Sequence, residues 1–442
     1  MDSKRRARPA AASSRPAWIA LSPAAQRSCG DFRPEARLRL FRENTRSEGA
    51  QQSVAISLSA EEELYWLALA MVPGLGARTA NRLLERYRNP QAMFRASRSE
   101  LENCGVSGSL AQSIASGCAF DDAAIQQKKM AACGAVLISI TDQRYPARLK
   151  EIFDPPPVLF ARGRVELLST IMIGVVGTRR PTPYGVAATE RLSSDLARAG
   201  LTIASGMARG IDSAAHRAAL GAECNTVAVL GCGVDVVYPA ENRHMAAQIA
   251  EKGLLVSEFP MGAPAYPQNF PIRNRVISGM SVGVLVVEGA QYSGSAITAR
   301  LALDQGREVF AVPGSIMSKM SWGPNLLIKQ GAKLVQDAND VLVELRADVR
   351  RELALLTQRG LFEPAASAET ADEPPASNEM NTANTAALRV LGQLQIETAT
   401  PIDDLLAKLE DMTSSEVIAA LFELEMAGAV RQLPGKNFVK VW

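Results

Sequence analysis

The central part of the chain alternates short apolar runs with helical stretches, and this pattern limits the possible folds more than any other feature. The apolar runs occupy residues 171–176, 201–204, 226–230, 254–257, 282–287 and 309–312, and most of them end in a glycine-rich turn. Strands that are buried on both faces have such near-continuous Val/Ile/Leu sequences, and strand–helix alternation builds a parallel sheet covered by helices. The sequence therefore predicts an α/β fold with a Rossmann-like parallel sheet over residues 136–350.

Bulk composition limits the classes of function. The 442 residues correspond to about three domains of ~150 residues each. The formal net charge of +2 excludes a uniformly basic protein, so a nucleic-acid site has to be a local cluster of Lys and Arg. The six cysteines form no CxxC pair and only two histidines are present, which argues against zinc and disulfides and for a reducing, cytoplasmic location. The apolar runs are shorter than the ~20 residues that span a bilayer, so we expect no membrane partner.

Two segments flank the central domain on its N-terminal side. Residues 1–52 are rich in Arg, Ala and Ser and are predicted to be a disordered basic tail. Residues 55–135 are predicted to form a helical, SAM-like domain in which Pro73-Gly74-Leu75-Gly76 joins two helices like a helix-hairpin-helix motif. Glycines in such a hairpin let backbone N–H groups face a DNA phosphate. The same hairpin also serves as a purely architectural turn, and the sequence leaves both interpretations open.

The C-terminal side contains a linker and a further small domain. Residues 357–384 have no period and are rich in Ala, Glu, Asn, Pro and Thr, so they are predicted to be a flexible linker. Residues 385–442 are predicted to be a winged helix with three helices and a hairpin. Thr400-Pro401 fits an N-cap and first helical position, and the four residues from Thr413 to Glu416 fit a capping box. Residues 410–429 hold five acidic residues and no Lys or Arg, so this domain is expected to bind another protein, or the chain's own other domains, rather than DNA.

The glycine-rich turns of the central domain are candidate phosphate sites, because ligands bind at the carboxyl ends of parallel strands. Gly177-Thr178-Arg179-Arg180 matches neither the GxGxxG nor the P-loop pattern. It offers a hydroxyl and two guanidiniums, which suit phosphate oxygens. The alternative is a tight turn with two solvated arginines.

Three further segments could contribute to such a site. In Phe270-Pro271-Ile272-Arg273-Asn274-Arg275, the arginines could neutralise phosphates while Phe270 stacks on a base, or the segment is a helix start with Phe270 in the core. Ser205-Gly206-Met207-Ala208-Arg209-Gly210 could present backbone N–H groups as an anion nest. Ser293-Gly294-Ser295 opens a helix with small residues suited to phosphate, and no G-x-S-x-G elbow marks Ser293 as a nucleophile.

Asp212 and His216 could form a catalytic pair, since residues four apart share a helix face. No third partner is evident, so a helix-start aspartate and a structural histidine are the favoured interpretation.

Taken together, these segments resemble the DprA/Smf family of DNA-processing proteins. The matching strings run in order over about residues 140–340 and include Ser205–Asp212, residues 228–235 with Tyr238-Pro239, residues 270–279 and residues 309–314. The resemblance implies a non-enzymatic protein without cofactor or metal. It also implies that the protein is a homodimer that binds single-stranded DNA in a positive pocket, and that it hands the strand to RecA recombinase, displacing single-strand-binding protein, during natural transformation.

The resemblance implies DNA-binding residues in three segments, namely the turn at Gly177, the turn at Ser205 and the segment that begins at Phe270. We add Arg209 and Ser293 because they lie in glycine-rich turns of the same kind. The full set is Gly177, Thr178, Arg179, Arg180, Ser205, Gly206, Met207, Arg209, Phe270, Arg273, Asn274, Arg275 and Ser293. One departure is that Tyr266-Pro267-Gln268-Asn269 stands where some members have a lysine, which leaves one phosphate contact in question.

An enzyme is the alternative, namely a nucleotide-binding or nucleotide-hydrolysing protein of the LOG group with a related Rossmann-like core. Enzymes of that group resemble one another in a PGGxGTxxE string. Here the first glycines are partly replaced in the segment from Ser293 to Arg300, no carboxylate follows Thr298 at the required place, and Glu288 lies upstream.

Overall fold

The structure is a computed structural model that describes residues 58–291, 293–360, 389–394, 400–409, 412–426, 430–433 and 437–440. It divides into two compact units, Met1–Glu363 and Pro364–Trp442, which are described separately. The predicted tail (1–52) lies outside the described residues, as does most of the predicted linker. Residues 357–360 of that linker are helical, because helix α16 (Ala347–Gly360) continues through them.

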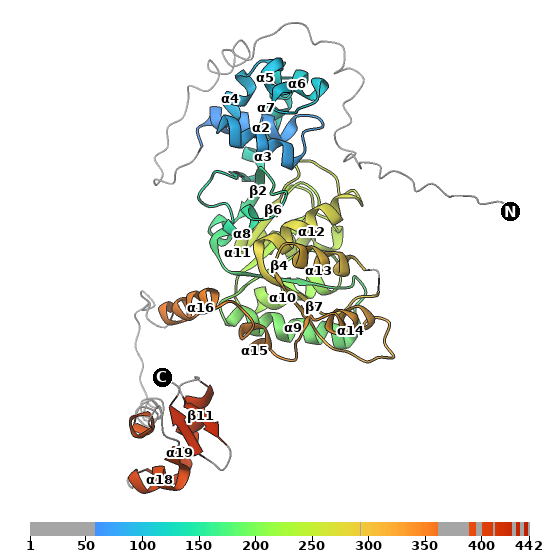
Figure 1. Cartoon of the computed structure of the whole chain (residues 1–442). Coiled ribbons are helices and arrows are strands. Elements are labelled where there is room, and N and C mark those ends of the chain that lie inside the picture. Colours follow the sequence, from blue (N-terminus) through green and yellow to red (C-terminus); the bar gives the residue numbers. More distant parts are fainter. Residues whose placement is uncertain are drawn as a thin grey trace, which may run out of the picture. The chain divides into compact units, whose positions relative to one another are not determined.

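A nine-stranded sheet organises the first unit, in the order β1-β2-β6-β5-β4-β3-β7-β8-β9 (Figure 1). Strands β3 to β9 run parallel to one another, which confirms the predicted Rossmann-like sheet. Antiparallel β1 and β2 extend it beyond β6. The strands are β1 (Val136–Ser139), β2 (Val158–Gly163), β3 (Met172–Val176), β4 (Thr202–Ser205), β5 (Thr226–Leu230), β6 (Leu254–Ser257), β7 (Ser281–Val286), β8 (Glu308–Ala311) and β9 (Lys333–Leu334).

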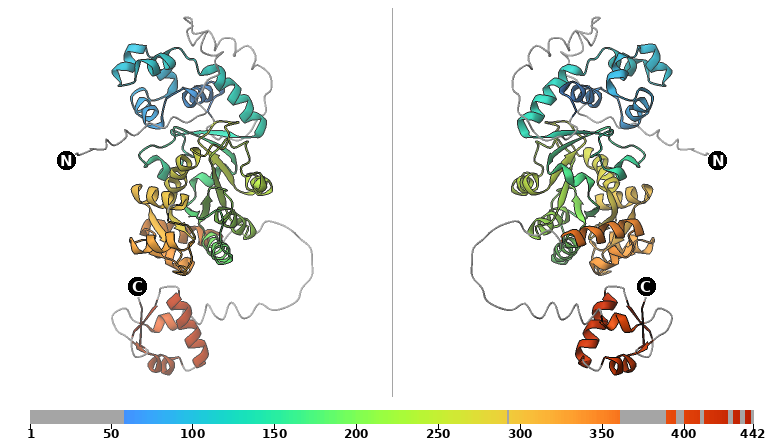
Figure 2. Two further views of the ribbon diagram at one scale, coloured as in Figure 1. Left: turned by 90° about the vertical axis from the view of Figure 1, so that its right-hand side faces the viewer. Right: turned by 90° about the vertical axis from the view of Figure 1, so that its left-hand side faces the viewer.

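Helices cover both faces of the sheet (Figure 2). Neighbouring residues of one strand belong to different cores, as Val284 and Leu285 of β7 do, because side chains of a strand alternate between its faces. Helices α12 (Asn269–Met280) and α13 (Gly294–Asp304) contribute side chains to one core. Helices α9 (Pro183–Arg198) and α10 (Ile211–Gly221) contribute side chains to the other. The remaining α-helices that follow β1 are α8 (Ala147–Lys150), α11 (Arg243–Lys252), α14 (Trp322–Lys329) and α15 (Ala338–Leu342). In the described part, no helix is both long and apolar enough to cross a membrane.

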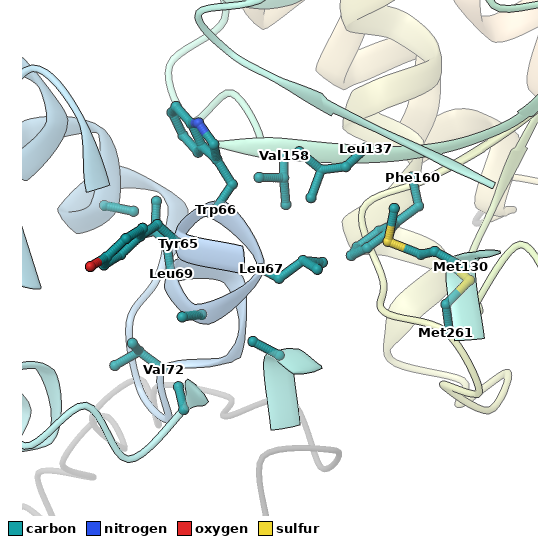
Figure 3. Close-up of a cluster of buried hydrophobic side chains, with 14 of the residues drawn as sticks. Tyr65, Trp66, Leu67, Leu69, Val72, Met130, Leu137, Val158, Phe160 and Met261 are labelled. Carbon is teal, nitrogen blue, oxygen red and sulfur yellow. The ribbon is translucent and has the colours of Figure 1, made fainter. Parts of the chain in front are cut away.

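Six helices precede the sheet and dock onto its antiparallel end. They are α2 (Ala60–Met71), α3 (Ala77–Tyr87), α4 (Pro90–Arg95), α5 (Arg98–Asn103), α6 (Gly108–Ala115) and α7 (Phe120–Cys133). Leu67 of α2 and Met130 of α7 belong to the same buried cluster as Val158 and Phe160 of β2 (Figure 3). Gln126 and Met261 also exchange two hydrogen bonds, at 2.8 and 3.3 Å. The helical module and the sheet thus share one core.

The second unit has its own buried core, which includes Val417, Leu421 and Phe438. Residues 389–393 are helical and precede α18 (Ile402–Lys408), α19 (Ser414–Met426) and a β10-β12-β11 sheet. The predicted hairpin is confirmed by antiparallel β11 (Val430–Leu433) and β12 (Asn437–Lys440). The predicted capping box also forms, since the Glu416 N–H donates to Thr413 Oγ1 at 3.3 Å and the Thr413 N–H donates to Glu416 Oε2 at 2.8 Å.

The prediction for Thr400-Pro401 was wrong. The two residues form strand β10 (Thr400–Pro401), which pairs with Asn437 and Phe438, and Pro401 is the N-cap of α18 rather than its first residue. The extended backbone that caps the helix is also the backbone that pairs with β12.

Candidate nucleic-acid interface

A small pocket lies where β3, β4 and β5 end. Its lining comes from the turns that follow these strands and from the start of α12, and consists of Arg179, Gly206, Ala208, Arg209, Leu230, Gly231, Cys232, Tyr238, Pro239 and Phe270. The cavity is about 50 Å³, much smaller than the roughly 300–1,000 Å³ of pockets that enclose a drug-sized ligand. A ligand of nucleotide size would therefore lie across its mouth. We call this site the aromatic pocket.

Phe270 forms the centre of the aromatic pocket. Its ring centroid lies 5.5 Å from that of Tyr238, with 33° between the planes. The guanidinium carbons of Arg179 and Arg273 lie 5.3 and 5.9 Å from the same centroid. The ring packs against Gly231, where a Cβ would come within 2.9 Å of it. Two aromatic rings and two guanidiniums are thus gathered at one point, within the range of cation–π attraction.

Arg179 and Arg180 are the available cations of the site. Both side chains are exposed, and neither forms an ion pair with a carboxylate in the part of the chain that the structure describes. Their turn is held by Thr178, whose N–H donates to the Glu288 carbonyl at 2.7 Å. Thr178 Oγ1 accepts a bond from the Arg180 N–H at 3.2 Å. The backbone is therefore fixed while the two guanidiniums remain free to meet phosphates.

Arg273 lies beneath the aromatic pocket rather than in solution. Its guanidinium is buried and donates to the Gly206 carbonyl at 2.7 Å and to the Val229 carbonyl, so it ties the ends of β4 and β5 together. Desolvation lowers the pKa of Arg273, and the nearby Asp212 opposes that shift. We conclude that Arg273 adds positive potential to the pocket from below.

The predicted anion nest is already occupied by the chain itself. Asp212 Oδ2 accepts bonds from the N–H groups of Gly206 and Ala208, at 3.2 and 3.3 Å. Met207 between them has a φ of +54°, a conformation uncommon outside glycine, and its carbonyl accepts a bond from Asn242 Nδ2 at 2.9 Å. These N–H groups hold the turn, which corrects the expectation that they are free for phosphate.

Asp212 and His216 do not form a catalytic pair. His216 is fully buried, and its Nδ1 lies 2.7 Å from Thr226 Oγ1. The Thr226 hydroxyl donates to the Ile203 carbonyl at 2.9 Å, so Nδ1 has to carry a proton and donate the first bond. Burial lowers the pKa of His216 to about 3. The favoured structural interpretation of both residues is consistent with this geometry.

Of the other predicted site residues, Arg209 reaches the aromatic pocket but forms two 2.6 Å bonds to Glu241. Ser205 and Met207 are buried, and Ser205 Oγ donates to the Val175 carbonyl at 2.6 Å. Asn274 Oδ1 accepts a bond from Arg273 Nε at 3.2 Å. Ser205, Met207 and Asn274 therefore support the pocket from behind its lining.

Four of the thirteen predicted residues line the aromatic pocket, namely Arg179, Gly206, Arg209 and Phe270. The other nine, which include Arg275, Ser293 and Gly177, lie outside its lining. Arg275 is buried, donates to the Asp154 carbonyl and is paired with Glu258. Ser293 is the N-cap of α13, and its hydroxyl lies 2.7 Å from that of Ser295. Gly177 is needed for packing, since a Cβ there would come within 2.5 Å of Ile211.

Tyr238 is the functional candidate that sequence reasoning missed. It is exposed, stacks near Phe270 and precedes Pro239, which also lines the aromatic pocket. The sequence contains a pattern that could have identified Tyr238, because this aromatic residue, followed by Pro239, comes shortly after the glycine-rich turn that ends β5.

Comparison with known proteins places the chain in a family. A family model described as DNA recombination-mediator protein A matches residues 136–346, and a model of the DprA winged helix domain matches residues 366–436. Protein Smf of Synechocystis is 33% identical over 398 residues, a match that covers 85% of this chain and 98% of that protein. This chain belongs to the DprA/Smf family.

Further DprA/Smf relatives agree with this assignment. Protein Smf of Escherichia coli is 40% identical over 300 residues, covering 68% of this chain and 76% of that protein. The X-ray structure of DprA from Streptococcus pneumoniae superposes with a TM-score of 0.58 at 34% identity, covering 66% of this chain and 99% of that one. The resemblance stated from the motifs is thereby confirmed, as are the Rossmann-like core and the winged-helix domain.

Proposed function

We propose that this chain binds single-stranded DNA across the aromatic pocket. The observation that carries the proposal is the grouping of Phe270, Tyr238 and the unpaired Arg179 at the carboxyl ends of three strands. Proteins that bind single strands combine aromatic rings, on which bases stack, with cations that follow the phosphates. In this arrangement Phe270 and Tyr238 face bases, while Arg179 and Arg180 meet the backbone.

Nucleotide hydrolysis is less well supported by the same geometry. Among the described residues, the lining of the aromatic pocket includes no carboxylate that could act on a sugar. Glu288 is buried, and both its oxygens accept bonds from Thr182, at 2.6 and 2.9 Å. Incubation with nucleoside monophosphates should therefore release no free base, and release that depends on Glu288 would support the enzyme instead.

A salt titration tests the DNA proposal directly. Affinity for a single-stranded oligonucleotide should exceed that for a duplex, and Arg179→Ala should weaken it and lower the salt slope by about 0.7, the value expected for one lost phosphate contact on a single strand. Arg350→Ala, on the exposed face of α16, is the matched control. An Arg179→Ala protein with the wild-type affinity and slope would contradict the assignment.

Family membership supports a wider role. We propose that the chain acts in the cytosol as a homodimer, protects incoming single strands and loads RecA recombinase onto them during natural transformation, displacing single-strand-binding protein. Wild-type protein should accelerate RecA filament formation on a strand covered by single-strand-binding protein, and Arg179→Ala should reduce that acceleration. Equal filament formation with and without the protein would refute the loading role.

A further inference from the structure

We propose that a second groove, between α3 and the segment that follows α8, binds a further stretch of the same single strand; this inference rests on the proposed function. The groove measures about 950 Å³ and lies within the first unit. Its polar lining includes Arg78, Arg82, Arg88 and Lys150 together with Glu85. We call it the α3 groove. It has room for nucleotide-sized groups, unlike the aromatic pocket.

The α3 groove is strongly positive in a chain that is almost neutral. Four cationic residues and one anionic residue line it, whereas the whole chain has a net charge of +2. All four cationic side chains are exposed. None of the four forms an ion pair with a carboxylate in the described ranges of the chain. A concave, positive surface of this kind concentrates polyanions.

The acidic residues next to the groove are engaged elsewhere. Asp142 is paired with Arg144 at 2.7 Å, Glu151 with Arg307 at 3.5 Å, and Asp154 with Arg275 at 3.5 Å. None of these three arginines lines the groove. These three carboxylates thus form their ion pairs with arginines outside the groove. Lys150 Nζ lies 3.5 Å from the Asp142 carbonyl, so it retains donors for an external anion.

Phe153 gives the α3 groove an aromatic face. Its side chain is 75% exposed, which is unusual for phenylalanine, and the guanidinium carbon of Arg78 lies 3.9 Å from the ring centroid. The neighbouring backbone is anchored, because Asn81 Nδ2 donates to the Pro155 carbonyl at 2.8 Å and Arg275 donates to the Asp154 carbonyl. The ring is therefore presented to solvent on a fixed loop.

An exposed ring beside unpaired arginines is the combination already found in the aromatic pocket. Bases of a single strand can stack on such a ring, while those of a duplex are covered by their neighbours. The α3 groove therefore fits a single-stranded nucleic acid better than a duplex.

Oligonucleotides of increasing length test the proposal on the full chain. Short strands occupy the aromatic pocket alone, so Phe153→Leu and the double variant Arg78→Gln/Lys150→Gln should bind them as wild type does. Long strands should bind both variants more weakly, and the loss for Phe153→Leu should be about 5-fold to 100-fold, the range expected for one lost base–aromatic contact. Leucine retains apolar surface without an aromatic face, so Phe153→Leu separates stacking from general apolar contact.

Controls distinguish this inference from the proposed function. Phe153→Trp should retain long-strand affinity and show quenching of the new tryptophan by long strands only. Arg95→Gln, an exposed change on α4 of the same module, should bind like wild type. Arg179→Ala should weaken binding at every length. The proposal for the α3 groove would be contradicted if the groove variants bound strands of every length like wild type, or lost equal affinity on short and long strands. Either result would leave the proposed role of the aromatic pocket unaffected. A wild-type chain that binds no single strand would overturn both.

Discussion

At the residue scale, Gly206 shows how closely the site is packed. A Cβ at this position would lie 2.5 Å from Nη2 of Arg273, the buried guanidinium that ties β4 to β5. The neighbouring turn adds constraint, because Asp212 accepts a bond from the Gly206 N–H. A methyl group here has to displace either Arg273 or the turn.

We therefore expect Gly206→Ala to lower both the midpoint of urea unfolding and the affinity for single-stranded DNA. Overpacking of this kind typically costs about 1–3 kcal/mol. Gly221→Ala is the matched control, because Gly221 is the last residue of α10 and a Cβ there meets nothing within 4 Å. That variant should be as stable as wild type or more stable by up to about 1 kcal/mol. Similar losses in both variants would contradict the steric argument.

His216 makes stability depend on pH. Its pKa is lowered from 6.5 to about 3 in the folded chain because the ring is buried. Between these values the unfolded chain binds a proton that the folded chain does not. The free energy of unfolding is therefore unaffected by the titration of His216 above pH 6.5 and decreases as the pH falls below that value. The loss amounts to about 1.4 kcal/mol per pH unit inside that window.

His216→Asn should lower this pH dependence, since asparagine can donate to Thr226 but does not titrate. Urea unfolding of both proteins at several pH values between 7 and about 4.5 measures the difference in slope. Because carboxylates titrate in both proteins alike, only the difference between them reports on His216. Parallel curves would show that His216 becomes protonated without unfolding.

The sequence identified the residue types of the site but not their exposure. It grouped Arg179, Arg273 and Arg275 as phosphate contacts, yet only Arg179 is exposed. The partners that bury the other two, such as the Val229 carbonyl and the Glu258 carboxylate, come from distant parts of the chain. No local pattern contains that information.

At the element scale, α12 connects two parts of the first unit. Phe270 and Arg273 near its start face the ends of β4 and β5, while Arg275 two positions on reaches Glu258 and the loop at Asp154. Residues two apart point to different sides of a helix. One short motif therefore supports the aromatic pocket and also fixes the loop that presents Phe153.

Arg275→Ala should lower the free energy of unfolding by about 3–5 kcal/mol, because it leaves the Glu258 carboxylate buried without its partner. Burial already raises the pKa of Glu258, and Arg275 is the group that opposes the shift. The double variant Arg275→Met/Glu258→Gln should regain much of the loss, and urea titration measures both. A single variant as stable as wild type would show that the pair contributes little.

Element boundaries were predictable where one signal dominated. β5 and β6 start and end where the apolar runs do, and the Thr413 capping box marks the start of α19. The start of α9 carries a similar local signal, since Thr182 is its N-cap and Pro183 its first residue. The antiparallel pairing of β1 and β2 depends on long-range contacts and carries no local signal.

At the scale of the whole molecule, the two units have separate cores and different surface charge. The second unit presents α19, whose exposed residues include Glu416 and Glu425 and which contains no Lys or Arg. An acidic helix repels phosphates. A chain that ends at Glu363 should therefore bind single-stranded DNA with the affinity and salt slope of the full chain. Fluorescence anisotropy measures both, and a clear loss of affinity would assign DNA contacts to the second unit.

The shared core of the helical module and the sheet has a consequence for local unfolding. Because Leu67, Met130 and Phe160 belong to one buried cluster, the module cannot open without exposing the apolar face of β2 to water. Backbone amides of α2, α7 and β2 should then exchange their hydrogens with deuterium at rates set by a single opening free energy, as one cooperative foldon. Helices α2 to α7 would then be a structural continuation of the sheet rather than an appended domain.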